Sequence, residues 1–500
     1  MRKKTFLTLI LCLLLIFTVS IAEVCGQSDS LILEAEQNWD TCGSGGTCIY
    51  GGHNFAVADV DGDGVEELIT GGSSYNYMPN GSRTSGWAPF KIWTWNGQSI
   101  VLEKNESWTG ALYCIRAGDA DGDGKIEILT SGRIANSTGS YSSLRIWTWD
   151  GESLFLRAHF EGSAVGSVIA LGLSSDGKPE IVTVGFAFRD EQIATQLSMW
   201  QFNGDSLTLT GSVTDDSLAR VNSVCTCDLD NDGVTEIVTA GYASSLKNSS
   251  GNLSVWRWDG QILSLLSTEE WRLVDGYALN SAGNTQGNTL VSTVKAADVD
   301  NDGVTEIVTS GFTYDGSIVE GQLRIWNWIG GVLHLEKSNE WKNLDITEHT
   351  SMTINDVDGD GVKEIITSGY TVGYGSFAVN ATDKSRAELR VWSWDGITLA
   401  QEQFKDWIVN KSVAAWNVGA GDVDNDGVVE IMTVGCTQIG NLLDCDPDLR
   451  IWSFSSESQA AFPDVGAPTI SVAIVIIGVL VAMFLLIRRK LRTNMNKDKV

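Results

Sequence analysis

The residues of this chain that are most clearly suited to chemistry are acidic side chains in a nine-residue motif that recurs along the sequence. Aspartates occupy positions one, three and five of the motif, glycine occupies position six and glutamate position nine. Carboxylates this close repel one another by roughly 4 kcal/mol per pair at an effective dielectric constant of about 20, so a cation is needed to hold them together. Calcium accepts about six to eight oxygen ligands with loose geometry, and it is the ion that we expect here.

Six intact copies of the motif supply the predicted calcium ligands. They are Asp59, Asp61, Asp63 and Glu67; Asp119, Asp121, Asp123 and Glu127; Asp228, Asp230, Asp232 and Glu236; Asp298, Asp300, Asp302 and Glu306; Asp356, Asp358, Asp360 and Glu364; and Asp422, Asp424, Asp426 and Glu430. A degraded copy, Gly172 to Glu180, keeps only Asp176 and Glu180, and we expect it to bind no calcium. A backbone carbonyl at position seven, such as that of Val65, is expected to complete the coordination shell, by analogy with an EF-hand loop. For a single copy, the alternative is a solvated acidic turn without metal.

Short strands rather than helices must position these carboxylates. An EF-hand carries its bidentate glutamate at position twelve and has a helix on either side, whereas here the glutamate stands at position nine. Residues 55–58 (Phe-Ala-Val-Ala) precede the first loop, and residues 68–71 (Leu-Ile-Thr-Gly) follow it. Both runs are β-prone and bounded by glycine. Each acidic loop is therefore predicted to join the two strands of a hairpin.

Two further motifs follow each hairpin and give every repeat four strands, which we call A to D. Strand A precedes the acidic loop and strand B follows it. Strand C carries two tryptophans two residues apart, as in Trp93 and Trp95, which places both on the same side of the strand. An Asn-Gly or Asp-Gly turn then leads into strand D, seen as residues 100–103 and ending near Trp108. Because the tryptophan pairs recur at one strand position, packing between neighbouring repeats is favoured over stacking against a sugar.

Seven repeats of about 60 residues predict an all-β, seven-bladed β-propeller over residues 31–454. The last repeat stops after strand C at Phe454, and the missing strand D motif stands at the start of the chain, at residues 31–34 and Trp39. The N-terminal strand is therefore expected to close the last blade, which would remove the open sheet edges. An open solenoid is the alternative, but it would carry capping repeats at both ends.

These motifs resemble those of the FG-GAP repeat family, the calcium-bearing seven-bladed propellers that include the head of the integrin α-subunit. The resemblance covers about residues 31–454 and rests on the Asp-x-Asp-x-Asp-Gly loops. It implies that each loop joins the first two strands of a blade and binds calcium, with about six ions in the whole chain. The glutamate at position nine, where integrins usually have aspartate, makes the likeness closer to prokaryotic cell-surface repeat proteins.

The two ends of the chain predict a single-pass cell-surface protein. Residues 1–22 combine a basic start with an apolar run, as in a secretory signal peptide, with cleavage as late as Gly26 also compatible. Residues 470–487 form an uncharged apolar run long enough to span a bilayer as a helix. The basic residues at the start of 488–500 would keep that tail cytoplasmic. Residues 455–469 would form a short stalk below an extracellular domain.

The net charge and the cysteines fit this compartment. The formal net charge of −29 comes largely from the acidic loops, whose 24 carboxylates are site chemistry, and it argues against a nucleic-acid partner. Cysteines in an extracellular domain can oxidise. We expect disulfides that bracket short loops, Cys42–Cys48 and Cys436–Cys445, and free thiols at Cys114, Cys225 and Cys227. Asn-x-Ser/Thr glycosylation acceptors stand at Asn80, Asn105, Asn136, Asn248, Asn252, Asn380 and Asn410.

Alternating strand direction would sort the connections onto two faces. The calcium loops and the C–D turns would share one face, expected to look toward the membrane, and the longer B–C and D–A connections would share the other. Function concentrates in variable loops on a rigid frame, so the second face is the candidate ligand face. The four histidines stand in unrelated places, and no catalytic motif is present.

We therefore expect a monomeric, membrane-anchored binding or adhesion module for glycans or surface proteins rather than an enzyme. The alternatives are a calcium-dependent polysaccharide lyase or hydrolase, and a purely structural component of the cell envelope.

Overall fold

The structure is a computed structural model in which residues 30–455 are described with gaps. The described residues are 30–39, 46–49, 54–76, 86–136, 139–162, 168–173, 177–189, 192–215, 220–244, 249–272, 288–314, 318–373, 385–409, 413–438 and 445–455. Ser30–Phe454 forms one compact body. The predicted signal peptide, membrane span and cytoplasmic tail lie outside these residues, as does the predicted stalk beyond Ser455. Within the described part the chain consists of strands and turns without a helix, which confirms the predicted all-β class.

Among the described residues, no helix is both long and apolar enough to cross a bilayer.

The strands of the described residues follow the predicted A to D order. Strand A is β3 (Phe55–Ala58), the end of β7 (Ile100–Gly118), β11 (Val168–Leu173), β15 (Arg220–Cys227), β19 (Asn288–Ala297), β23 (Ile346–Asn355) and β27 (Val413–Gly421). Strand B is β4 (Glu67–Gly71), β8 (Glu127–Asn136), β12 (Pro179–Arg189), β16 (Glu236–Ser244), β20 (Glu306–Tyr314), β24 (Glu364–Val372) and β28 (Glu430–Gln438).

The outer two strands of each repeat complete the inventory. Strand C is β6 (Trp87–Trp95), β9 (Gly139–Trp149), β13 (Gln192–Phe202), β17 (Ser249–Trp258), β21 (Val319–Ile329), β25 (Arg386–Trp394) and β29 (Cys445–Ser455). Strand D is the start of β7, then β10 (Leu154–Gly162), β14 (Leu207–Asp215), β18 (Leu263–Trp271), β22 (Val332–Trp341), β26 (Leu399–Trp407) and β1 (Ser30–Asn38). A short additional pair, β2 (Gly46–Ile49) with β5 (Ser73–Asn76), lies beside the first repeat.

Each repeat forms a four-stranded antiparallel unit, and we number these units 1 to 7 from β3 onward. Hydrogen bonds run A to B to C to D within a unit, as in β11-β12-β13-β14 of unit 3. Unit 7 has the order β27-β28-β29-β1, so the first strand of the chain pairs with the last, as the sequence led us to expect. The side chains agree, since Ser453 Oγ donates to Glu34 Oε1 at 2.7 Å.

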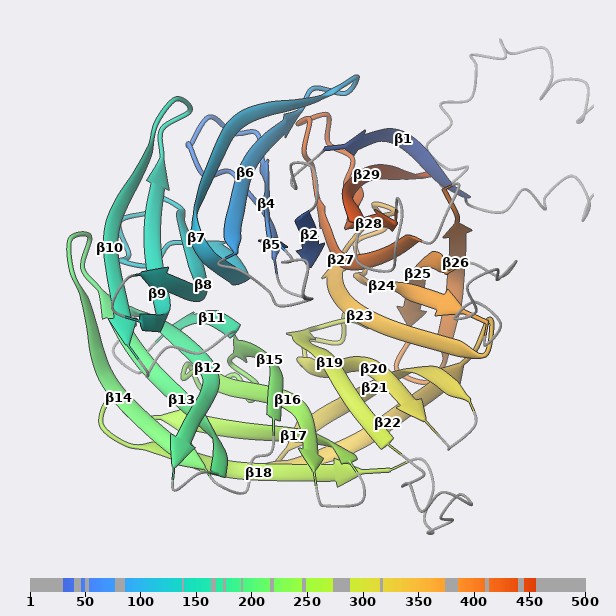
Figure 1. The fold of residues 1–500 in the computed structure, drawn as a ribbon. Coiled ribbons are helices and arrows are strands. Elements are labelled where there is room, and N and C mark those ends of the chain that lie inside the picture. The colour runs from blue at the N-terminus through green and yellow to red at the C-terminus, as the bar shows by residue number, and fades with distance from the viewer. Residues whose placement is uncertain are drawn as a thin grey trace, which may run out of the picture. The chain divides into compact units, whose positions relative to one another are not determined.

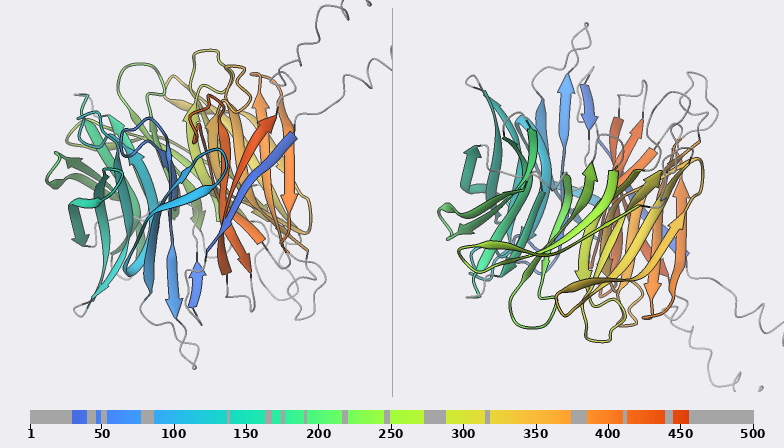
Figure 2. Two further views of the ribbon diagram at one scale, coloured as in Figure 1. Left: turned by 90° about the horizontal axis from the view of Figure 1, so that it is seen from above. Right: turned by 90° about the horizontal axis from the view of Figure 1, so that it is seen from below.

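The innermost strands of successive units contact one another. Strand A of each unit contacts strand A of the next, from β3 through β7, β11, β15, β19 and β23 to β27, and β27 in turn contacts β3. Figure 1 shows the units following one another in chain order around a common centre, and Figure 2 shows their strands nearly side by side when the body is turned by 90°. This order places all the acidic A–B loops at equivalent positions of their units.

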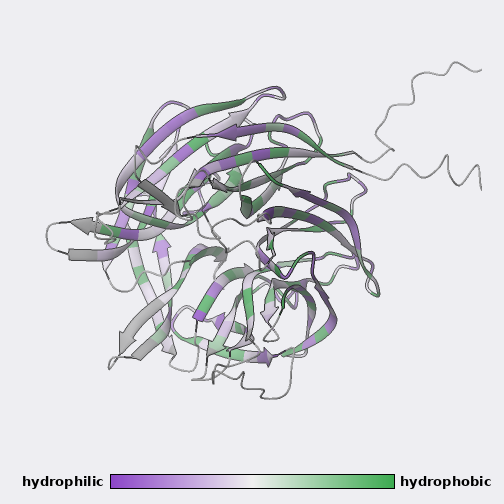
Figure 3. Ribbon diagram, turned by 45° about the vertical axis from the view of Figure 1, so that its right-hand side comes forward, coloured by the Kyte–Doolittle hydropathy of each residue, from purple (hydrophilic) through white to green (hydrophobic). Residues whose placement is uncertain are grey.

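Burial is greatest in strands B and C and lowest in the outermost strand D, and it explains the sequence pattern. Strand B is covered on both faces, so β4 is a continuous buried run. Strand D alternates half-buried with exposed residues, as β18 does, because one of its faces meets water. Figure 3 shows hydrophobic residues distributed along the strands rather than gathered in one layer. The core is therefore divided among the interfaces between neighbouring units.

The first tryptophan of each strand C is fixed in the same way in all seven units. Its indole N–H donates to a threonine hydroxyl on strand B, at 2.9–3.1 Å. The pairs are Trp93–Thr70, Trp147–Thr130, Trp200–Thr183, Trp256–Thr239, Trp326–Thr309, Trp392–Thr367 and Trp452–Thr433. A buried indole keeps its hydrogen bond in this arrangement, so the ring can pack in the core.

Most of these rings pack against aromatic residues on or just after strand D in the preceding unit. Trp341 at the end of unit 5 lies 4.7 Å from Trp392 of unit 6, between ring centroids. Trp39, which follows β1, lies 4.9 Å from Trp93 of unit 1. The tryptophans are thus core residues between units, which is the role favoured by their recurrence in the sequence.

Several details differ from the sequence-based expectations. Strand D of unit 1 and strand A of unit 2 form one 19-residue strand, β7, where we expected two. The connection expected over residues 72–89 contains β5 and the start of β6. Asn252, one of the predicted glycan acceptors, lies in β17 with its side chain buried, and its amide donates to Thr268 Oγ1 at 3.2 Å. A glycan on Asn252 would require that strand to open.

The cysteines within the described residues behave as expected. Cys436 is disulfide-bonded, while the side chain of Cys445 and the predicted Cys42–Cys48 pair lie outside the described side chains. Cys114, Cys225 and Cys227 are free thiols. Burial raises the pKa of Cys225 to about 12, so this thiol is protonated and unreactive at neutral pH.

Candidate metal centres

Each acidic loop joins strands A and B of its unit, and the final residue pair of that hairpin sets its geometry. Ala58 pairs with Glu67 as the last step of β3 and β4, directly before Asp59. Positions one and nine of the loop are therefore neighbours across the hairpin. The same closing pair recurs in the other intact loops, for example Ala297 with Glu306. Strand pairing, rather than a pair of helices, brings the carboxylates together.

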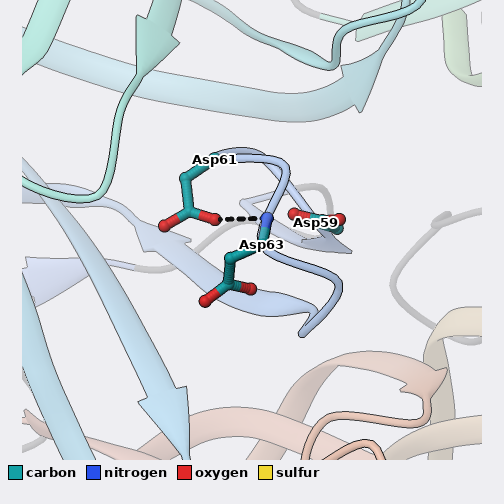
Figure 4. Close-up of side chains that lie close together, drawn as sticks. All are labelled: Asp59, Asp61 and Asp63. Carbon is teal, nitrogen blue, oxygen red and sulfur yellow. Dashed lines mark hydrogen bonds between the residues drawn. The ribbon is translucent and has the colours of Figure 1, made fainter.

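In the first loop, backbone amides hold both oxygens of the position-one aspartate and one oxygen of the aspartates at positions three and five. Asp59 Oδ1 accepts from the Gly62 amide at 2.7 Å and Oδ2 from the Gly64 amide at 3.0 Å. Asp61 Oδ1 accepts from the amide of Asp63 at 3.0 Å, the bond drawn in Figure 4. Asp63 Oδ1 accepts from the Val65 amide at 2.8 Å. The second oxygens of Asp61 and Asp63 have no such bond within the described residues.

The glutamate at position nine is buried and fixed by one oxygen. Its Oε2 accepts the amide N–H of position two at 2.9–3.1 Å in all six intact loops. These amides belong to Val60, Ala120, Leu229, Val299, Val357 and Val423. In unit 4 the other oxygen, Glu236 Oε1, accepts from Arg257 Nε at 2.8 Å.

The loop oxygens converge closely enough to share one ion. Carboxylate atoms from three residues of a loop lie within 4.8 Å of one another, as for Asp59, Asp61 and Asp63 in Figure 4. Similar groups occur in the loops that begin at Asp119, Asp228, Asp298 and Asp356. The structure thus brings together three of the four predicted ligands in each of these five loops. The carbonyl expected at position seven stays a prediction.

Left-handed backbone at two positions closes each loop. Position six is the glycine that the sequence singled out, with φ of +94° at Gly64. Position four was not singled out, although it is also left-handed: φ is +80° at Gly62 and +57° at Asn231. Glycine and asparagine are the residues that tolerate this region best. The recurrence of either Gly or Asn at position four is the sequence signal that could have predicted this left-handed backbone.

Burial and the neighbouring aspartates raise the pKa values of the position-nine glutamates. Burial, followed by the charges of Asp61, Asp63 and Asp59, raises the pKa of Glu67 to about 7, against the Val60 amide that lowers it. The pKa values of Glu127, Glu306 and Glu430 are likewise raised to about 7, and that of Glu364 to about 8. An opposite charge nearby would favour the ionised carboxylates. Hard oxygen donors in a flexible loop are the set that calcium accepts, so the residues fit this ion.

Two units depart from this pattern. In unit 3 the degraded copy leaves Glu180, whose Oε1 accepts the indole N–H of Trp258 from unit 4 at 3.0 Å, and Asp176 lies outside the described residues. In unit 4 the loop is intact, but Arg257 from strand C reaches its carboxylates. Arg257 Nη2 lies 3.1 Å from Asp232 Oδ2 and 3.5 Å from Asp230 Oδ2.

Four of the intact loops, those of units 1, 2, 5 and 7, also meet the C–D turn of the following unit. A Cβ added to Gly151 in unit 2 would lie 2.9 Å from Asp61 Oδ2 of unit 1, so only glycine leaves that oxygen its room. A Cβ added to Gly396 would likewise lie 2.9 Å from Asp300 Oδ2, and one added to Gly97 of unit 1 would lie 2.9 Å from Asp424 Oδ2 of unit 7. The position-three aspartate is therefore placed by two units, its own and the next.

A cleft of about 710 Å³ lies beside the first two loops. Its lining includes Asp61 of unit 1, Asp121 and Lys125 of unit 2, and the exposed Phe155 and Arg157 of β10. Arg157 Nη2 donates to the Gly204 carbonyl of unit 3 at 3.0 Å. Acidic, basic and aromatic groups thus meet on the calcium-loop side, whereas much of the predicted ligand face, including residues 273–287 and 374–384, lies outside the described residues.

Comparison with known proteins yields only distant structural likeness. No protein-family model matches the chain, and no curated protein sequence matches it. The rhamnogalacturonan lyase PL11 of Bacillus licheniformis is similar with a TM-score of 0.36 and 16% identity, over 78% of this chain and 75% of that one. The rhamnogalacturonan lyase YesW gives a TM-score of 0.33 and 14% identity, over 81% and 91%. Sqt1 from Chaetomium thermophilum gives 0.43 and 10%, over 84% and 100%. Likeness at this level assigns the chain to no family.

Proposed function

We propose that this chain is a calcium-binding, seven-bladed β-propeller of the FG-GAP type, anchored in the membrane by residues 470–487. It acts outside the cell as a monomeric binding or adhesion module for glycans or surface proteins. The observation that carries the proposal is the repeated A–B hairpin loop, in which backbone amides orient the carboxylates and leave oxygens open toward a shared centre.

Three contacts between unit 7 and unit 1 support the ring architecture. Strand β27 contacts β3, Trp39 stacks on Trp93, and Gly97 lies against Asp424. With β1 paired to β29, the first and last strands of the chain are held in one sheet. Closure of this kind covers sheet edges that would otherwise pair with other chains.

The calcium proposal rests on the donor set of the loops. Aspartates at positions one, three and five, with glutamate at position nine, would hold the ion. Bound calcium would supply positive charge that offsets the repulsion among these carboxylates. The residues of the loop themselves do the rest: the amides orient the oxygens, and the glycine at position six turns the chain. We regard these sites as structural, since each one fixes a hairpin at the same place in its unit.

Within the described residues, the cleft beside units 1 and 2 is the proposed ligand-binding surface. Its Lys125 and Arg157 could pair with carboxylate or sulfate groups of an acidic glycan, and the ring of Phe155 could cover a sugar face. The adjoining loop carboxylates would be ordered by calcium, which makes binding calcium-dependent. The opposite face stays the second candidate surface.

A glycan array probed with the full-length chain tests the binding proposal. We expect binding to acidic glycans that is lost in chelator and weakened at least tenfold by Phe155→Ala. Leu265→Ala, which removes an equally exposed apolar side chain from strand D of unit 4, is the matched control and should leave binding unchanged. Cleavage of an acidic polysaccharide by the purified chain would instead favour the alternative, a calcium-dependent lyase or hydrolase.

A further inference from the structure

Arg257 occupies an unusual place in unit 4. It stands on strand C between Trp256 and Trp258, directly opposite Glu236 on strand B. Both Nε and Nη2 of Arg257 donate to Glu236 Oε1, the oxygen not used by the backbone, the Nε bond at 2.8 Å. Together with the contacts to Asp230 and Asp232, the guanidinium meets the carboxylates at positions three, five and nine of this loop.

The equivalent strand C position is uncharged beside every other intact loop. It is Thr94, Thr148, Asn327, Ser393 and Ser453 in units 1, 2, 5, 6 and 7. Three of these side chains donate outward to a glutamate on strand D. Thr94 donates to Glu103 at 3.1 Å, Asn327 to Glu336 at 2.8 Å and Ser453 to Glu34 at 2.7 Å.

The strand D position that faces this site also changes in unit 4. Each described C–D pair has a register shift beside the first tryptophan, and the residue in that bulge is Glu103, Glu336 or Glu402 in units 1, 5 and 6. These glutamates lie near enough to add negative charge to their loops, since Glu103 acts on Asp61 and Glu336 on Asp300. Unit 2 has Arg157 in the bulge, and unit 4 has Leu266. Compared with units 1, 5 and 6, unit 4 therefore lacks an acidic side chain on strand D and carries a basic side chain, Arg257, on strand C.

We infer that the guanidinium of Arg257 takes the place of the cation in the loop Asp228–Glu236, and that this loop binds no calcium. This inference rests on the calcium sites proposed for the other loops. A guanidinium keeps its charge at all physiological pH values and presents several donors in a fixed plane, so it can satisfy carboxylates of the loop at once. To bind at the same centre, a calcium ion would have to displace the guanidinium and break its contacts with Asp230, Asp232 and Glu236.

The consequence is a division of the ring into two parts. Unit 3 lacks most of its loop carboxylates, and unit 4 carries its own cation, so units 3 and 4 form an adjacent pair that is independent of calcium. Units 5, 6, 7, 1 and 2 follow one another and depend on it. The six intact loops of the sequence then hold five ions.

Calcium content measured by elemental analysis of the full-length chain, after equilibration with calcium and gel filtration, tests this inference. We expect five ions per chain for the unsubstituted protein. Arg257→Thr, which installs the residue that unit 1 has at this position, should raise the content to six. Asn327→Arg makes the reverse change in unit 5 and should lower it to four. Arg386→Thr removes an arginine at the start of strand C in unit 6, which pairs with Asp406 away from the acidic loops, and should leave the content at five.

The outcomes separate the two proposals. Six ions in both the unsubstituted protein and Arg257→Thr would overturn the role of Arg257 while leaving the calcium sites intact. No bound calcium in any variant would overturn the calcium sites themselves. If Arg257→Thr fails to fold, the Asn327→Arg variant still decides the matter, because a content that stays at five would show that an arginine at this position does not exclude the ion.

Discussion

At the scale of single residues, the loop carboxylates are ordered before any ion arrives. Asp59 accepts two backbone amides, and Glu67 is held by Val60. The sequence predicted these ligands because alternating aspartates and a turn glycine are visible in one dimension. It could not reveal Arg257, because that residue enters the loop across a strand pair 21 positions away from Glu236. Only the register between strands B and C shows that Arg257 lies opposite Glu236.

Substitution Asp61→Asn tests the ligand role of one side chain. The asparagine Oδ1 can still accept the Asp63 amide, so the loop keeps its shape while one anionic oxygen is lost. We expect one ion fewer per chain, and a lower melting temperature in calcium but not in chelator. Asp150→Asn is the control, since asparagine already stands at this turn position in units 1 and 3, and it should change neither quantity. An unchanged ion count for Asp61→Asn would contradict the assignment.

Substitution Thr183→Val tests the recurring hydrogen bond to tryptophan. Both Thr183 and Trp200 are fully buried, so removing the hydroxyl leaves the indole N–H without its acceptor. We expect a loss of about 1–3 kcal/mol in the free energy of unfolding, measured by denaturant titration. Thr183→Ser retains the hydroxyl and should lose clearly less. Equal losses for the two variants would mean that packing, not the hydrogen bond, fixes the ring.

At the scale of elements, the hairpins and their order were predictable and their junctions were not. Period-two patterns and Asn-Gly or Asp-Gly turns identified strands A to D. The sequence did not predict the continuous strand β7, because strand D was expected to end near Trp108. No proline and no glycine pair between Trp108 and the next acidic loop indicates how strand D passes into strand A. The bulges of strand D were also invisible, although they aim Glu103 and its equivalents at the calcium loops.

Substitution Gly151→Ala tests the contact between a C–D turn and the loop of the preceding unit. Gly151 has φ of +83°, and its added Cβ would meet Asp61 Oδ2. Gly260→Ala is a matched control, with φ of +89° and nothing within 4 Å. Both should lose about 1–2 kcal/mol through backbone strain. Only Gly151→Ala should also weaken calcium binding in unit 1, seen by calorimetry; equal calcium affinities would refute the contact.

At the scale of the whole molecule, the pairing of the first strand with the last was predictable from the register of the two ends. The chain stops after a strand C and begins with a strand D, and β1 does pair with β29. The proposed division of the units into a calcium-dependent and a calcium-independent group was not predictable. It depends on the identity of the bulge residue Leu266 and of Arg257, neither of which belongs to the acidic motif.

The raised pKa values of the loop glutamates predict how the calcium-free protein responds to pH. Glu67, Glu127, Glu306 and Glu430 have pKa values raised to about 7, and Glu364 to about 8, from 4.5. Between about pH 4.5 and pH 7–8 the folded state binds more protons than the unfolded state, so stability falls as pH rises. His349, whose pKa burial lowers, opposes this trend as a single group.

Denaturant unfolding in chelator at pH 5 and pH 7.5 measures this response. We expect the free energy of unfolding to fall by several kcal/mol over the interval in chelator, at about 1.4 kcal/mol for each pKa unit of a group. The fall should disappear in calcium, where the ion stabilises the ionised carboxylates. Stability in chelator that is flat or rises with pH would contradict the raised values.

Thermal melting of the full-length chain in saturating calcium and in chelator tests the central claim most directly. An ion that binds only the folded state stabilises it by about 2.7 kcal/mol per site when the free ion is a hundredfold above its dissociation constant. With several such sites, we predict a large fall in melting temperature in chelator that calcium restores and magnesium restores poorly. The same melting temperature in calcium and in chelator would contradict the account.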